Sequence, residues 1–258
     1  LYGKGKMMIP AKVAHASDIV EINTFEQLRE LDSHSNHLQS EILEIAAAAL
    51  HTELDNISNI TVLKKGTTNR SFLSDCNGTK HIMRIPGEGT DQLINRREEA
   101  QVYQVIKDKG LCDDIEYINP ENGYKLTRFL KNVRVCDPDN PDDLAKCMKK
   151  LRQFHEMKLK VNHRFDVFKQ IEFYESLWNG QLSVYRDYKK TKEQVFSLQS
   201  YIEKYKEEEV LTHIDAVPDN FLFTTDADGN EDIRLIDWEY AGMQDPHVDI
   251  AMFSIYAF

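Results

Sequence analysis

The most constraining feature of the sequence is a short hairpin with polar residues on both sides. Its predicted strands cover residues 221–223 and 233–236, and an Asp-, Gly- and Asn-rich turn joins them. Asp215 and Asn220 precede the first strand, and Asp237 directly follows the second. Because a hairpin brings the start of its first strand beside the end of its second, we expect these three side chains to lie close together.

This set of side chains suits phosphoryl transfer. Carboxylate and amide oxygens bind the Mg²⁺ that bridges nucleotide phosphates, and an acceptor hydroxyl needs a base beside them. In this interpretation Asp215 accepts the hydroxyl proton, and Asn220 and Asp237 hold Mg²⁺. The alternative is that His213 and Asp215 only bond the loop backbone and that Asp237 caps a turn. The alternative is better for any one residue alone, whereas the whole pattern favours a kinase.

The composition restricts the partners of the chain. The formal net charge is −11, which disfavours nucleic acids and anionic membrane surfaces as partners because both require a basic face. No apolar run approaches the roughly 18 residues of a membrane span, and no signal peptide is evident. The four cysteines lack the spacing of zinc or redox motifs. We therefore expect a cytoplasmic protein, and its oligomeric state cannot be read from the sequence.

The residues before the hairpin predict a leader followed by a small antiparallel sheet that carries one helix. Residues 1–37 form the leader, and apolar spacing predicts a helix from Leu38. The next helix is predicted over 91–109, with Asp91 as its N-cap and Gly110 as its stop. Strands are predicted over 60–63, 71–73, 80–85 and 124–130, with an Asn77-Gly78 turn between the second and the third.

Beyond Asp137-Pro138 the pattern becomes mainly helical. Apolar residues at helical spacing predict helices over 144–155, 165–178 and 192–205. We therefore predict an α+β fold with two lobes, a small antiparallel sheet lobe over 38–130 and a larger, mainly helical lobe over 131–258.

Several segments together resemble one protein family. His213-Ile-Asp-Ala-Val-Pro-Asp-Asn-Phe and Leu235-Ile-Asp-Trp-Glu-Tyr-Ala resemble the catalytic loop and metal-binding segment of bacterial choline kinases, within the choline/ethanolamine kinase and aminoglycoside phosphotransferase superfamily. Further matches at 94–99, 173–177 and 245–251 extend the resemblance from about residue 40 to the C-terminus. It implies a protein-kinase-like fold with ATP and Mg²⁺ in the cleft, phosphorylation of choline to phosphocholine, and a role for Asp249 in bracing the catalytic loop.

The resemblance also implies which residues contact ATP. The loop over the phosphates would be Gly66, Thr67, Thr68 and Asn69, although an ordinary hairpin turn explains this single-glycine segment equally well. Arg84 takes the place of the strand lysine of protein kinases and, paired with Glu99, would hold the α- and β-phosphates. The alternatives are a surface ion pair worth under about 1 kcal/mol, or Glu98 as the partner.

The resemblance places the adenine base at the connection between the lobes. There the backbone of Arg128 and Leu130 would pair with the adenine edge. Without the resemblance, the same residues read as an edge strand that leads into a loop.

A quaternary ammonium acceptor requires aromatic faces and a nearby carboxylate. The candidate carboxylate is Glu239, and the candidate aromatic residues are Tyr174, Trp178, Tyr240, Phe253 and Tyr256. Core packing is the alternative for each aromatic residue. The resemblance also implies that helices beyond the metal segment form much of the choline pocket, so the helical lobe is expected to be truncated at Phe258 and the acceptor is left open.

Two further functions are left open. The same machinery would serve ethanolamine, an aminoglycoside or another amino-alcohol as the acceptor. The chain could also be a non-catalytic nucleotide-binding module.

The leader has a resemblance of its own. Residues 18–28 resemble the last turn of a sugar-type nucleotidyltransferase domain, which predicts a fused parent protein. A simple amphipathic helix is the alternative.

Overall fold

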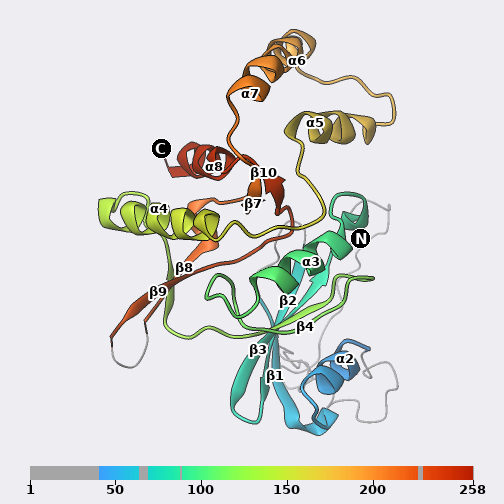
Figure 1. The fold of residues 1–258 in the computed structure, drawn as a ribbon. Coiled ribbons are helices and arrows are strands. Elements are labelled where there is room, and N and C mark those ends of the chain that lie inside the picture. The colour runs from blue at the N-terminus through green and yellow to red at the C-terminus, as the bar shows by residue number, and fades with distance from the viewer. Residues whose placement is uncertain (1–40, 64–68, 88, 226–228, 258) are drawn as a thin grey trace, which may run out of the picture.

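The computed structural model describes residues 41–63, 69–87, 89–225 and 229–257 (Figure 1). Within them the chain forms a small antiparallel sheet lobe and a larger, mainly helical lobe (Figure 1). The predicted α+β class is therefore confirmed. The predicted leader, 1–37, lies outside the described residues.

The sheet lobe contains a five-stranded antiparallel sheet in the order β1-β2-β3-β5-β4. Asn77 and Gly78 have φ angles of 52° and 80°, which form the predicted tight turn between β2 and β3. The edge strand β4 was not predicted. The strands are β1 (Ile57–Val62), β2 (Asn69–Cys76), β3 (Thr79–Pro86), β4 (Ile115–Ile118) and β5 (Lys125–Arg128).

Helix α3 (Arg96–Ile106) is shorter than the prediction at both ends. Its N-cap is Asn95, whose side chain accepts hydrogen bonds from the backbone amides of Arg97 (3.2 Å) and Glu98 (3.3 Å). The prediction of Asp91 as the cap was wrong, because Asp91 lies in a separate 3₁₀ helix, Thr90–Gln92. Asn95 satisfies the first free amides of α3, so the helix begins there.

The helical lobe combines helices with two small sheets. Strands β8 and β9 form the predicted hairpin, β6 pairs with β8, and β7 pairs with β10. The elements of this lobe are β6 (Val133–Val135), α4 (Pro141–Glu156), α5 (Val167–Ser176), α6 (Tyr188–Ser197), α7 (Gln199–Tyr205), β7 (Val210–Thr212), the 3₁₀ helix Pro218–Asn220, β8 (Phe221–Thr225), β9 (Glu231–Leu235), β10 (Gly242–Gln244) and α8 (His247–Ala257).

Two further elements lie on the sheet side. Helix α2 (Glu41–Ala49) packs on β1 (Figure 1), and the 3₁₀ helix Leu54–Asn56 directly precedes that strand.

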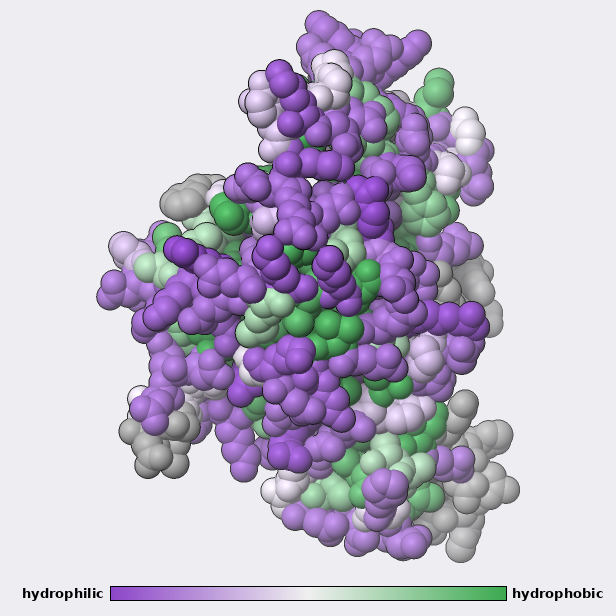
Figure 2. Space-filling model, in the orientation of Figure 1, coloured by the Kyte–Doolittle hydropathy of each residue, from purple (hydrophilic) through white to green (hydrophobic). Residues whose placement is uncertain are grey.

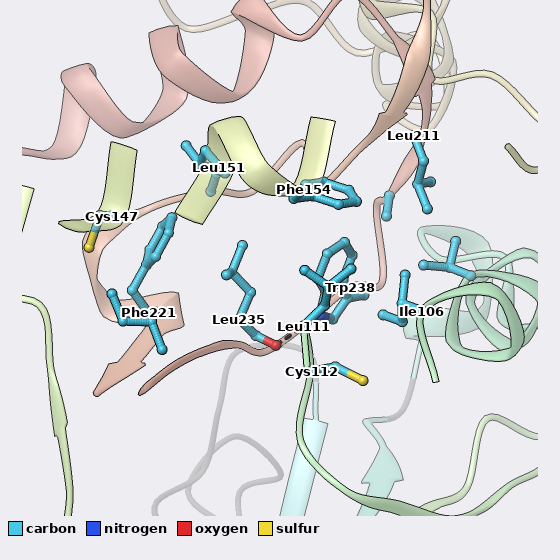
Figure 3. Close-up of a cluster of buried hydrophobic side chains, with 14 of the residues drawn as sticks. Ile106, Leu111, Cys112, Cys147, Leu151, Phe154, Leu211, Phe221, Leu235 and Trp238 are labelled. Atoms are coloured by element: carbon cyan, nitrogen blue, oxygen red, sulfur yellow. Dashed lines mark hydrogen bonds between the residues drawn. The ribbon is translucent and has the colours of Figure 1, made fainter. Parts of the chain in front are cut away.

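One buried cluster runs from α3 through α4 and β9 to α8 (Figure 3). Trp238, which follows Asp237, is fully buried, and its ring meets Phe154 of α4 edge-on with centroids 5.1 Å apart. Leu235 at the end of β9 is also fully buried. Because each such side chain stabilises the fold by about 1.5–3 kcal/mol, the core firmly anchors the residues on both sides of Asp237.

The surface is mostly polar. Figure 2 shows hydrophilic side chains over most of the visible face, with apolar groups gathered near its middle and over the sheet lobe. All four cysteines are buried and unbridged. Among the described helices, none combines the length and the apolar character that crossing a bilayer requires.

Candidate active site

A cavity of about 550 Å³ lies where the sheet lobe meets the helical lobe. Alternate residues of β2, β3 and β5 line its roof, because side chains on one face of a strand recur every second residue. The roof residues are Asn69, Ser71, Ile82, Arg84, Lys125 and Thr127, and the helical lobe contributes Asp215, Leu222, Ile236, Asp237, Glu239 and Tyr240. A neighbouring cavity of about 590 Å³ at the start of α3 shares Glu239 and Tyr240 but not the two aspartates.

Asp249 of α8 holds the loop that carries Asp215. Its carboxylate accepts hydrogen bonds from the backbone amides of His213 (2.9 Å) and Ile214 (2.7 Å) and from His155 Nε2 (2.8 Å). Ile214 has a φ of 71°, which β-branched residues rarely adopt. The predicted bracing role of Asp249 is confirmed, and its bonds hold the loop in this strained conformation.

His213 is a structural residue of this loop. It is fully buried, its Nε2 donates to the Ile236 carbonyl (2.9 Å), and its ring packs on Trp238 with centroids 4.5 Å apart. Burial lowers the pKa of His213, and the nearby Asp249 only partly opposes this. The imidazole is therefore neutral and ties the loop to the residue before Asp237.

The structure brings Asp215, Asn220 and Asp237 together. The side-chain amide of Asn220 donates to the backbone carbonyl of Asp215 (2.8 Å) and to its carboxylate (3.2 Å). The backbone carbonyl of Asn220 accepts from the amide of Ile236 (3.0 Å), the residue before Asp237. Both aspartates line the same cavity. The hairpin thus produces the convergence that the sequence predicts.

The donor set around Asp237 fits Mg²⁺. Asp237 has a φ of 67°, and within the described part of the chain its carboxylate accepts no hydrogen bond, so it is not a turn cap. Burial raises the pKa of Asp237, and the nearby Lys125 and Arg84 only partly offset this effect. A bound divalent cation would favour the ionised carboxylate. Both side-chain bonds of Asn220 use its nitrogen, which leaves its oxygen for a metal. Among the described residues no group of three or more His, Cys, Asp or Glu side chains is arranged to hold a metal ion by itself, and Mg²⁺ typically uses few protein ligands.

Arg84 and Glu99 form a buried bidentate ion pair. Their contacts measure 2.5 and 2.9 Å, and the side chains are 6% and 0% exposed. Arg84 Nη2 also donates to the Gly123 carbonyl (3.0 Å). The pairing with Glu99 is confirmed, and the alternatives of a surface pair or of Glu98 as the partner are wrong.

Lys125 is a residue of the cavity that the sequence analysis missed. It pairs with Arg84 across β3 and β5, so both side chains point to the same side of the sheet. Its Nζ donates to the hydroxyl of Tyr103 (2.6 Å) and lies 3.8 Å from the Asp113 carboxylate. Only the register of β5 against β3 could have revealed it, because Lys125 belongs to no local motif.

The residues predicted to contact ATP are described only in part. Gly66, Thr67 and Thr68 lie outside the described residues, whereas Asn69 lines the cavity, and its side-chain amide donates to Glu239 Oε2 (3.0 Å). Arg128 and Leu130 also line the cavity. The Arg128 amide donates to the Asp114 carbonyl (2.9 Å) and is therefore already used, whereas the Arg128 carbonyl could accept from an adenine amino group.

The predicted acceptor residues separate into two groups. Glu239 and Tyr240 line the cavity. Trp178 instead packs on Tyr188 with ring centroids 5.1 Å apart, and Tyr256 is 62% exposed on α8. The structure therefore does not bring Trp178 and Tyr256 to the cavity. The other two aromatic candidates, Tyr174 and Phe253, pack on Phe173 and Phe221.

The chain is similar to known proteins over most of its length. A family model described as choline/ethanolamine kinase matches residues 60–257. Protein LicA of Haemophilus influenzae is 30% identical over 195 residues, which are 72% of this chain and 55% of that protein. The crystal structure of choline kinase LicA from Streptococcus pneumoniae has a TM-score of 0.72 at 26% identity and covers 86% of this chain and 75% of that one. A structure of LicA in complex with AMP, also at 26% identity, covers the same shares with a TM-score of 0.67.

The structural similarity confirms the predicted protein-kinase-like fold. The chain spans about half the length of the Haemophilus relative.

Proposed function

The chain belongs to the choline/ethanolamine kinase family, and from this premise we propose that it transfers the γ-phosphoryl group of ATP to the hydroxyl of choline. The observation that carries the proposal is that Asp215 and Asp237 line one cavity together with Arg84, while the Asn220 amide bonds the Asp215 carboxylate and Glu99 holds Arg84. This arrangement supplies a base, metal ligands and a cation for the phosphates, which are the parts that phosphoryl transfer requires.

In this proposal Asp215 orients the acceptor hydroxyl and accepts its proton. The amide of Asn220 holds the Asp215 carboxylate at 3.2 Å and so fixes its direction. Asn220 and Asp237 would hold Mg²⁺, which when bound neutralises charge on the phosphates. Arg84, fixed by Glu99, would hold the part of the nucleotide that is not transferred. Most of the rate acceleration then comes from positioning and from charge stabilisation.

The proposed nucleotide site is the part of the cavity that β2, β3 and β5 line. A solved LicA structure in complex with AMP supports nucleotide binding by this fold. Asn69, with the preceding Gly66, Thr67 and Thr68, would cover the phosphates, and the backbone of Arg128 and Leu130 would meet the adenine. The division into an ATP-binding lobe, 38–130, and a catalytic lobe, 131–258, is part of the same proposal.

Choline is the proposed acceptor because a solved relative is named a choline kinase. Glu239 and Tyr240 at the cavity would offer the carboxylate and the aromatic face that a quaternary ammonium requires. The family description also includes ethanolamine kinases, so ethanolamine is the second candidate. The following experiment distinguishes choline from ethanolamine, from another amino-alcohol and from an aminoglycoside. It also distinguishes a kinase from a non-catalytic nucleotide-binding module.

The test is a panel of acceptors incubated with the protein, Mg²⁺ and γ-labelled ATP. We expect labelled phosphocholine, with a higher kcat/KM for choline than for ethanolamine or kanamycin. Preferential labelling of ethanolamine or kanamycin would contradict choline as the acceptor. Nucleotide binding without transfer to any acceptor would instead favour the non-catalytic module.

A further inference from the structure

Arg96, in the first turn of α3, is charged but only 6% exposed. Its Nη1 donates to Glu99 Oε2 (3.0 Å) and Glu239 Oε2 (3.3 Å). Its Nη2 donates to Asn69 Oδ1 (3.3 Å) and lies 3.5 Å from Thr90 Oγ1. A planar guanidinium can serve several acceptors in this way because its donors lie in a fixed fork.

The partners of Arg96 join the two lobes. Asn69 begins β2 in the sheet lobe, and Glu239 follows the Asp237 segment in the helical lobe. The Asn69 amide donates to the same Glu239 oxygen (3.0 Å) that accepts from Arg96. Arg96, Asn69 and Glu239 therefore form a closed triangle of hydrogen bonds at the edge of the cavity.

Arg96 also balances the charges around Arg84. Glu99 and Glu239 are buried carboxylates, with 1% and 8% exposure, and burial is costly for a carboxylate without a paired cation. Arg84 bonds Glu99 and lies 3.9 Å from Glu239. If a neutral residue replaced Arg96, both glutamates would compete for Arg84. The Arg84 guanidinium would then be drawn away from its position on Glu99.

The turn before β5 fixes both arginines. The Gly123 carbonyl accepts from Arg84 Nη2 (3.0 Å), and a Cβ at position 123 would lie 2.5 Å from Arg96 Cδ. Gly123 also has a φ of 71°, a conformation that favours glycine. The absence of a side chain at Gly123 therefore allows Arg96 to lie beside Arg84.

We propose that Arg96 is a positioning residue for nucleotide binding: it neutralises Glu99 and Glu239 and links Asn69 to Glu239, so that Arg84 and Asn69 stay directed at the nucleotide phosphates. The inference rests on the proposed function, because it takes the cavity to be the ATP site. It assigns Arg96 no contact with the nucleotide.

The test compares Arg96→Gln with Arg96→Lys and with Arg97→Gln as the matched control. Arg97 is the adjacent arginine of α3, but its side chain is 68% exposed and pairs with Glu121. We expect the Kd for Mg²⁺-ATP, measured by calorimetry, and the KM for ATP to rise about tenfold in Arg96→Gln. Arg96→Lys should fall between Arg96→Gln and the wild type because it keeps the charge but loses the fork. Arg97→Gln should match the wild type in both quantities.

An unchanged Kd for Mg²⁺-ATP in a folded Arg96→Gln would overturn the inference. A merely structural role would lower kcat and the number of binding sites but leave the Kd and KM for ATP unchanged, and this result would overturn it as well. If Arg96→Gln does not unfold cooperatively in urea, Arg96→Lys decides: a weakened Kd supports the inference, and an unchanged one contradicts it. If the wild type binds ATP but phosphorylates no acceptor, the proposed function fails, while the Kd comparison still tests Arg96.

Discussion

Replacement of Arg84 by methionine tests whether the buried ion pair is essential to the fold as well as to the site. Arg84→Met removes the cation but keeps much of the aliphatic volume. It leaves the fully buried Glu99 without a donor at 2.5 Å and the Gly123 carbonyl without its donor at 3.0 Å. Breaking a buried pair typically costs about 3–5 kcal/mol because the remaining charge stays buried.

Arg96 moderates this cost. Arg96 Nη1 already lies 3.0 Å from Glu99 Oε2 and is kept in this variant, so we expect the lower end of the range, about 3 kcal/mol. The matched control is Glu121→Gln, which breaks the Arg97–Glu121 pair, whose side chains are 68% and 67% exposed. An exposed pair of this kind contributes about 0.2–1 kcal/mol.

The assay is urea denaturation followed by circular dichroism. We expect Arg84→Met to lower the free energy of unfolding by about 3 kcal/mol with an unchanged m-value, and Glu121→Gln to lower it by less than about 1 kcal/mol. Equal losses in both variants, or a loss below about 1 kcal/mol in Arg84→Met, would refute the view that burial makes the Arg84 pair strong.

Three further predictions concern the metal site, the turn at Gly123 and acid stability. Asp237→Asn should weaken Mn²⁺ binding in the presence of ATP by at least about tenfold, as measured by electron paramagnetic resonance; unchanged binding would remove Asp237 from the metal site. Gly123→Ala should lower the free energy of unfolding by about 1–3 kcal/mol because of its φ of 71° and the crowding at Arg96, and a neutral effect in urea melts would contradict this geometry. The Arg134 guanidinium holds the pKa of Asp143 below its ordinary value of 3.8. Asp143 therefore contributes stability above pH 3.8 that is lost as the pH falls through its lower native pKa; Asp143→Asn should remove this acid-dependent part, and parallel pH–stability curves would disprove it.

The local sequence was sufficient to predict the hairpin of β8 and β9 and the turn at Asn77-Gly78. In both cases neighbouring residues determine the geometry, because positive φ at Gly78 and the hairpin from β8 to β9 require no distant contact. The Arg84–Glu99 pair was also predictable, because a known family pattern specifies which strand and helix meet.

Other parts of the site depend on tertiary contacts. Lys125 enters the cavity through the register of β5 against β3, and Arg96 becomes a link between the lobes only when Glu239 reaches α3. Helix α3 begins at Asn95 rather than Asp91, although both are good capping residues, because a 3₁₀ turn occupies Thr90–Gln92. Trp178 was an acceptor candidate for its chemistry alone, and packing on Tyr188 takes it away from the cavity.

The most direct test of the account compares Asp215→Asn with Asp219→Asn, a neighbouring aspartate whose side chain is exposed. We predict that Asp215→Asn lowers the kcat for choline phosphorylation by roughly 10²–10⁴ while the Kd for Mg²⁺-ATP stays within about twofold of the wild type. Asp219→Asn should match the wild type in both. An Asp215→Asn enzyme that retains wild-type kcat would contradict the role of Asp215 as the base and the site built around it.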